Sequence, residues 1–213
     1  DSFPDEGSVS RDRVRPFVIR TEKRDSIDAD GQPLFKPRIT RLQAVAWQDR
    51  HGAQQRLYEA VTDYVRHGYN QALVAKQRHI GFLMILMQRL VTSSTAAIRT
   101  TLERRQTLLN EPQPQASLFD STEMDEWAEM DGQSQVDIAV QTSGWAQEKA
   151  EVDLLLNLAR ETEAQGTDAK AEALLELIYK LQQEENDPTM KVLIFTEFVP
   201  TQAMLAGFLE SRG

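Results

Sequence analysis

The chain has 213 residues, 40% of them hydrophobic and 27% charged, which is ordinary for a soluble globular protein. It contains no cysteine, which excludes a disulfide framework and a thiolate metal site. The longest apolar run, residues 81–87, is far too short for a membrane span, and the polar N-terminus lacks the apolar stretch of a secretory signal. A cytoplasmic location with no membrane contact is therefore expected.

Charge is distributed unevenly along the chain. Residues 1–109 carry 18 Lys and Arg against 12 Asp and Glu, whereas residues 110–187 carry 4 against 19, and the net charge is −9. Residues 76–105 contain a single acid, Glu103, and six basic residues: Lys76, Arg78, Arg89, Arg99, Arg104 and Arg105. Two interpretations stay open, since a basic half can face nucleic-acid phosphates, or can pair with the acidic half or be solvated.

The first 47 residues contain several turn formers and predict a turn-rich segment with strands near residues 17–20 and 42–47. From Gln54 the apolar period becomes helical and predicts a helix that ends near Gly68. A second helix is expected from about residue 69 to residue 90, with its all-apolar stretch buried on most sides.

A third helix is predicted after Ser93 or Ser94, either of which suits an N-cap. One face of this helix carries residues at helical spacing: Ala97, Ile98, Thr101, Leu102, Arg105 and Leu108. The segment 110–145 holds eight acidic residues and predicts a linker with a short helix around residues 123–130. Two further helices are expected, with apolar stripes over 152–159 and 174–181 and a break at Gly166.

The last 23 residues predict one strand and one helix. Residues 192–195 form a short β-branched and aromatic run, which suits a buried parallel strand. From Thr201 the apolar residues return at helical spacing, at Met204, Leu205, Phe208 and Leu209. A strand followed by such a helix is the first half of a βαβ unit.

Three segments carry a resemblance to a known family. Residues 191–198, K-V-L-I-F-T-E-F, resemble motif IV at the start of the second RecA-like lobe of superfamily-two helicases. Residues 15–25 with 30–38 resemble the stretch that closes the first lobe in Swi/Snf-type ATPases, and residues 86–105 resemble a helix pair of RapA-like bacterial members. The chain thus resembles the region between the two lobes of a Swi/Snf-type, RapA-like ATPase.

The resemblance implies a mainly α fold, in which a helical inter-lobe bundle is followed by the first strand and helix of an α/β RecA-like lobe. The expected divisions are 1–47, the tail of lobe one; 48–109, a basic helical bundle; 110–145, an acidic linker or insertion; 146–187, a helical pair; and 188–213, the start of lobe two.

The function implied is that of a fragment of an ATP-dependent DNA helicase or translocase. The parent would hydrolyse ATP with Mg²⁺ and bind double-stranded DNA. The chain has neither a G-x-x-x-x-G-K-[ST] loop nor a DEAH-like tetrapeptide, so no catalytic residue, cofactor or metal is expected in it. Its expected partners are the remaining lobes, and the isolated fragment is expected to dimerise through its unpaired strand.

Eight residues are candidate nucleic-acid contacts: Thr196, Thr201, Arg20, Lys23, Arg89, Arg99, Arg104 and Arg105. A threonine hydroxyl at a helix N-terminus suits a phosphate, although Thr201 can equally cap its helix. Arg20 and Lys23 match the family's basic stretch, but Ile19 replaces its first arginine, and a surface ion pair is the alternative for Arg20.

The rival function is a free-standing helical adaptor whose apolar helix 81–91 docks a protein partner. The three histidines, His51, His67 and His79, match no metal or acid–base motif and are expected at the surface or boundary of helices.

Overall fold

The computed structural model describes residues 26–35, 38–110, 130–141, 144–145, 147–166 and 168–212. The chain divides into two units, residues 1–44 and 45–213. In the first unit, Ile27 and Pro33 form an antiparallel bridge around a turn at Gly31, whose φ of 78° suits glycine. The strand predicted at 17–20 lies outside the described residues, and residues 42–47 form no strand.

In the part of the second unit that the structure describes, all regular structure is helical, which confirms the predicted mainly α fold. Its elements are η2 (Asp49–His51), α2 (Gly52–Ala75), α3 (Arg78–Ser93), α4 (Thr95–Asn110), α6 (Gly132–Ala139), α7 (Glu148–Ala164), α8 (Ala169–Glu184) and α9 (Val199–Glu210). Within the described residues, no helix combines the length and apolarity needed to cross a membrane.

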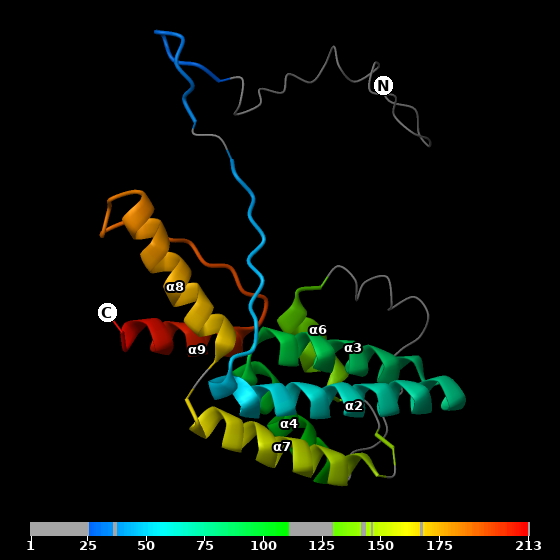
Figure 1. Cartoon of the computed structure of the whole chain (residues 1–213). Coiled ribbons are helices and arrows are strands. Elements are labelled where there is room, and N and C mark those ends of the chain that lie inside the picture. Colours follow the sequence, from blue (N-terminus) through cyan, green and yellow to red (C-terminus); the bar gives the residue numbers. More distant parts are fainter. Residues whose placement is uncertain are drawn as a thin grey trace, which may run out of the picture. The chain divides into compact units, whose positions relative to one another are not determined.

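Four of these helices close into a bundle. Helix α2 packs against α3 and α7, and α4 packs against the same two helices (Figure 1). Each helix turns one face inward at a spacing of three and four residues, as Leu57 and Val61 do on α2 and Val152 and Leu156 on α7. Helix α6 packs on α3, while α9 packs on α4 and α8.

The boundary between the first two helices was predicted wrongly. Helix α2 continues through Gly68 to Ala75, and the turn is made by Lys76, whose φ of 54° ends the helix. Gly68 remains helical because it is a point of close approach: a Cβ there would overlap the Met84 sulfur and lie 2.9 Å from the Trp145 ring. The glycine serves packing rather than helix termination.

Helix α4 begins as the sequence predicts. Ser94 is the single residue between α3 and α4, and its hydroxyl accepts a hydrogen bond from the Ala97 backbone N–H at 3.1 Å. This bond satisfies one of the free donors at the start of α4. Ser94 is therefore the N-cap, and the prediction is confirmed.

Helix α6 was missed, because residues 110–145 were interpreted as a linker. Asp131 begins this helix by accepting a hydrogen bond from the Ser134 N–H, which together with the Ser134 hydroxyl lowers the pKa of its carboxyl. Val136, Ala139 and Val140 are buried. The helix predicted around 123–130 lies, apart from Met130, outside the described residues.

Helix α8 is attached to the start of α2 by a polar cluster. The Gln54 side chain donates to Asp168 at 2.9 Å and accepts from the Ala169 N–H at 2.9 Å. Glu172 pairs with Arg50 at 2.6 Å and with His51 at 3.0 Å. Burial alone would raise the pKa of Glu172, but the hydrogen bonds from Arg50 and His51 lower it below its ordinary value.

Residues 191–196 connect α8 to α9 without forming a strand, contrary to the expectation for 192–195. A strand needs a neighbour to accept and donate its backbone hydrogen bonds. None of the described residues supplies that neighbour, and Leu193 and Phe195 are 78% and 87% exposed. The strand expected at the start of the RecA-like lobe is therefore not formed in the described residues, whereas the helix expected from Thr201 is present as α9.

Gly68 and Gly81, which both lie inside helices, should respond oppositely to substitution by alanine. Gly68→Ala should lower the free energy of unfolding by about 1–3 kcal/mol through overpacking against Met84 and Trp145. At Gly81 an added Cβ would meet only Tyr69, at 3.8 Å, so Gly81→Ala should raise stability by about 0.5–1 kcal/mol. Urea unfolding of both variants measures this, and a shift of the same sign in both would contradict the packing argument.

The Glu172 cluster predicts an acid-sensitive attachment of α8. Because the pKa of Glu172 is lower in the folded chain, its contribution is complete above the unfolded value, about 4.3, and is lost as the pH falls through the folded value. The stability difference between wild type and Glu172→Gln should stay constant near neutral pH and shrink in acid.

Urea unfolding at a series of pH values tests this expectation. Glu176→Gln, which changes an exposed carboxylate on the same helix, is the matched control and should follow the wild-type curve. If wild type and Glu172→Gln differ in the free energy of unfolding as much at pH 3 as at pH 7, the ionised Glu172 does not stabilise the attachment of α8.

Candidate functional site

The first turn of α9 is joined to the link between α3 and α4 by three hydroxyl groups. The Oγ1 of Thr201 lies 2.8 Å from the Oγ of Ser93 and 2.8 Å from the Oγ of Ser94. Ser94 and Thr201 are buried, so these hydrogen bonds satisfy groups that water does not reach. Two segments more than a hundred residues apart are thereby held together.

A second set of contacts surrounds the hydroxyls. Phe198, the N-cap residue of α9, is fully buried in the bundle core. The Arg89 guanidinium pairs with Glu197, donates to Gln135 at 2.9 Å, and its central carbon lies 6.0 Å from the centre of the Phe198 ring. We call these six residues the α9 junction: Arg89, Ser93, Ser94, Glu197, Phe198 and Thr201.

The hydrogen bonds of the α9 junction are structural: they hold α9 to the link between α3 and α4. The hydroxyls of the junction bond one another, and the Ser94 hydroxyl also receives the Ala97 N–H. A nucleophilic hydroxyl requires a base within hydrogen-bond reach, and the partner of each serine here is the threonine. Among the described residues, no group of three or more His, Asp or Glu side chains is placed to hold a metal ion.

A cavity of about 240 Å³ lies beside the junction, between α8, residues 194–196 and α9. Its walls include Lys170 and Leu174 from α8, Phe195 and Thr196 from the connecting segment, and Met204 from α9. Thr196 is exposed, so of the two predicted threonines it alone presents its side chain to solvent.

Thr201 was predicted to contact a phosphate or to cap its helix, and its position agrees with neither prediction. It lies at the third position of α9, where Phe198 occupies the N-cap, so it does not cap the helix. Its side chain is buried and its hydroxyl is bonded to Ser93 and Ser94, which directs it away from any solvent-borne phosphate. Both interpretations overlooked a tertiary contact, which no local pattern reveals.

Three of the predicted phosphate-binding arginines lie in ion pairs with acidic residues. Arg104 pairs with Asp137 at 2.5 Å, and Arg99 pairs with Glu103 at 2.8 Å and also with Glu163. Arg89 pairs with Glu197. Two of these partners, Asp137 and Glu163, come from the acidic half of the chain, which favours the interpretation that the two halves pair with each other.

Arg105 is withdrawn from the nucleic-acid set, because its side chain is completely buried. It donates to both carboxylate oxygens of Glu148, each at 2.7 Å, and to the Val140 carbonyl at 2.7 Å. Glu148 is also fully buried and accepts the Tyr64 hydroxyl at 2.9 Å. A guanidinium enclosed in this way cannot reach a phosphate.

Burial and the Glu148 charge raise the pKa of Tyr64 well above its ordinary value, so its hydroxyl stays a donor. The Trp145 ring lies 5.4 Å from the Tyr64 ring and covers it. This network was not predicted from the sequence, although one signal was present: Arg105 shares the helix face of Ile98 and Leu102, which predicts burial.

The remaining predictions concern Arg20, Lys23 and the histidines. Arg20 and Lys23 lie outside the described residues. His51, expected near the surface, is 2% exposed and pairs with Glu172, whereas His67 is a boundary residue paired with Glu151 at 2.7 Å.

Comparison of the chain with protein-family models, with curated proteins and with solved structures gave no match. The geometry and the sequence resemblance are therefore the basis for the function proposed below.

Because Arg105 and Glu148 form a buried pair, we expect the stability losses of Arg105→Met and Glu148→Leu to be strongly non-additive in the double variant. Arg105→Met should lower the free energy of unfolding by about 3–5 kcal/mol, because it leaves the Glu148 charge buried and uncompensated. Adding Glu148→Leu should restore most of the loss, as replacement of a whole buried pair by apolar residues is often neutral.

Arg104→Met is the matched control, since it removes the neighbouring but exposed pair with Asp137 and should cost at most about 1 kcal/mol. All variants are compared by chemical denaturation. Additive losses for Arg105→Met and Glu148→Leu would refute the pair as a coupled unit.

Proposed function

We propose that this chain is the helical module between the two lobes of a Swi/Snf-type, RapA-like ATPase. In this proposal its role is to join the bundle rigidly to the first elements of the second lobe. The observation that carries the proposal is the α9 junction. It joins residues 86–105, through Arg89, Ser93 and Ser94, to Glu197, Phe198 and Thr201 at the end of the segment 191–198 and the start of α9. Residues 86–105 and 191–198 are two of the segments whose sequences resemble that family.

The exposed segment before α9 supports the same proposal. Val192, Leu193 and Phe195 present apolar side chains to solvent, and their backbone has no strand partner among the described residues. Such a β-branched, aromatic run is stabilised once parallel strands lie beside it and helices cover it. A RecA-like sheet would supply both.

The ion pairs support a mechanical role for the bundle. Because Arg89, Arg99 and Arg104 are neutralised by nearby carboxylates, binding a phosphate would require each to exchange an existing partner. In the proposed enzyme the ATP site, the Mg²⁺ and most duplex contacts would belong to the lobes. Among the described candidates, Thr196, exposed beside the cavity, remains a candidate phosphate contact, and Arg20 and Lys23, which lie outside the described residues, remain predictions.

The test uses the complete reading frame that contains this sequence. We expect the purified polypeptide to hydrolyse ATP faster when duplex DNA is added. Thr201→Val removes the hydroxyl that holds α9 to Ser93 and Ser94, and should reduce the DNA-stimulated rate roughly tenfold while leaving the duplex affinity nearly unchanged.

Thr107→Val is the control, because the Thr107 hydroxyl is exposed and bonds only within α4, to the Glu103 carbonyl. It should retain the wild-type rate. A reading frame without an ATP site, or a product that shows no DNA-stimulated hydrolysis, would overturn the proposal and leave the helical adaptor as the better account.

A further inference from the structure

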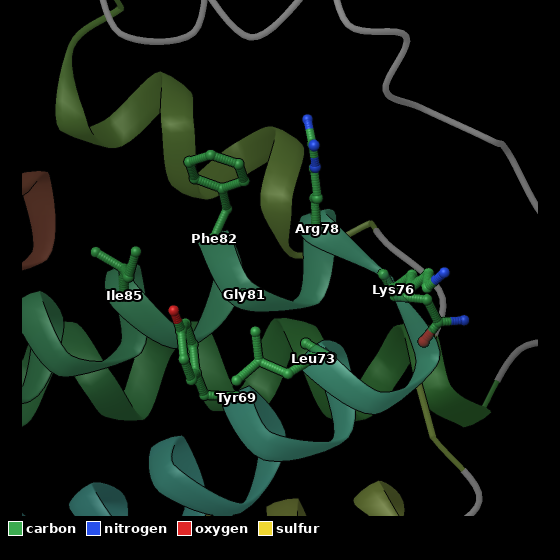
Figure 2. Close-up of a pocket in the computed structure, with 9 residues that line it drawn as sticks. Tyr69, Leu73, Lys76, Arg78, Gly81, Phe82 and Ile85 are labelled. Atoms are coloured by element: carbon green, nitrogen blue, oxygen red, sulfur yellow. The ribbon is translucent and has the colours of Figure 1, made fainter.

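The free end of the α2–α3 hairpin carries an apolar groove with a volume of about 460 Å³ (Figure 2). Its lining includes Tyr69 and Leu73 from α2 and Phe82 and Ile85 from α3. This volume lies in the range of sites that hold small molecules or peptide side chains. The groove belongs to one hairpin of the helical unit and is separate from the α9 junction.

The side chains around the groove are unusually exposed for their type. Leu73 is 62% exposed, Ile85 50% and Tyr69 44%. The bundle core does not require them, because α2 and α3 fill it with their opposite faces, including Leu57 and Met84. Apolar side chains gathered in this way on a surface mark an interaction site.

Gly81 forms part of the groove lining, and close packing does not explain why a glycine occupies this position. A Cβ at this position would meet only the Tyr69 ring, at 3.8 Å, which is ordinary contact. Glycine is unfavourable within a helix, and alanine would fit here. The absence of a side chain instead leaves space for an incoming group, in contrast to Gly68, where Met84 occupies that space.

The groove is basic at one end. Lys76 and Arg78 lie at the hairpin turn, and Ile85 lies at the opposite end (Figure 2). Neither Lys76 nor Arg78 forms an ion pair with a described residue, unlike the four arginines from Arg89 to Arg105. Two cations that have no carboxylate partner among the described residues, beside an apolar groove, are complementary to a ligand that is both apolar and acidic.

We propose that this groove binds an amphipathic helical segment of a partner protein, with large apolar side chains seated over Gly81 and carboxylates paired with Lys76 and Arg78. Recognition of this kind places side chains spaced one helical turn apart into a groove between two helices. The apolar contacts supply most of the affinity, and the two cations set the orientation and speed the encounter. The inference is independent of the ATPase proposal.

The test measures binding of a fluorescent synthetic helix to the whole chain by anisotropy. The probe carries Leu and Trp one turn apart with glutamates at one end, and a second probe has lysines in place of the glutamates. We expect the acidic probe to bind, its affinity to fall with added salt, and the lysine probe to bind at least about tenfold more weakly.

Variants then locate the site. Gly81→Leu should fill the groove and reduce affinity by about tenfold or more, and the pair Lys76→Glu with Arg78→Glu should do the same. Two controls are matched to them. Gly207→Leu adds the same side chain to α9 where nothing lies within 4 Å, and Arg66→Glu reverses an exposed charge elsewhere on α2. Both should bind as wild type, and circular dichroism checks that every variant is folded.

Three outcomes would overturn the inference. The first is no binding of the acidic probe, or binding that Gly81→Leu leaves unchanged. The second is self-association of the chain that Gly81→Leu abolishes while the probe does not bind, which would assign the groove to a second copy. The third is binding of oleate but not of the peptide, lost in Gly81→Leu, which would assign it to an anionic amphiphile. Because none of these measurements uses ATP, their failure is distinct from failure of the proposed translocase role.

Discussion

The buried pair of Arg105 and Glu148 is the constraint on which the bundle depends. It connects α4 to the first residue of α7, and through Tyr64 it connects both to α2. A bidentate contact fixes the rotation of each helix about its axis more tightly than apolar packing alone, because the planar guanidinium matches the carboxylate in one geometry. The Val140 carbonyl uses a further donor and fixes the end of α6 in the same way. Three interfaces of the helical unit thus share one buried ion pair.

Much of the fold follows from local pattern. The inward faces of α2, α4 and α7 repeat at helical spacing, and Ser94 has the chemistry of an N-cap, so these elements could be predicted. The misplaced turn at Gly68 has a different origin. A glycine ends a helix when the chain needs the backbone conformations that only glycine adopts easily. At Gly68 the missing side chain instead lets Met84 approach the helix closely. Helix α6 was missed because its few buried residues sit within an acidic stretch that resembles a linker.

The candidate site was less predictable than the fold, because its chemistry arises between distant residues. A count of charges separates a basic half from an acidic half, but cannot tell that Arg104 lies against Asp137 or Arg99 against Glu163. The burial of Thr201 likewise depends on Ser93 and Ser94, more than a hundred residues earlier. Arg105 is the exception: its helical register predicted burial, and its positive charge was given more weight than its position.

The order of the paired groups along the chain also shapes how the molecule folds. Helices α2 and α3 are joined by two residues, so their mutual contacts are local and form early. Closure of the bundle must await α7, which brings Glu148 into place long after Tyr64 and Arg105 have left the ribosome. Until then the nascent hairpin exposes the faces that α7 later covers, together with an uncompensated arginine. Arg105, which pairs with Glu148 in the finished bundle, is therefore without this partner in the growing chain until α7 has been synthesised.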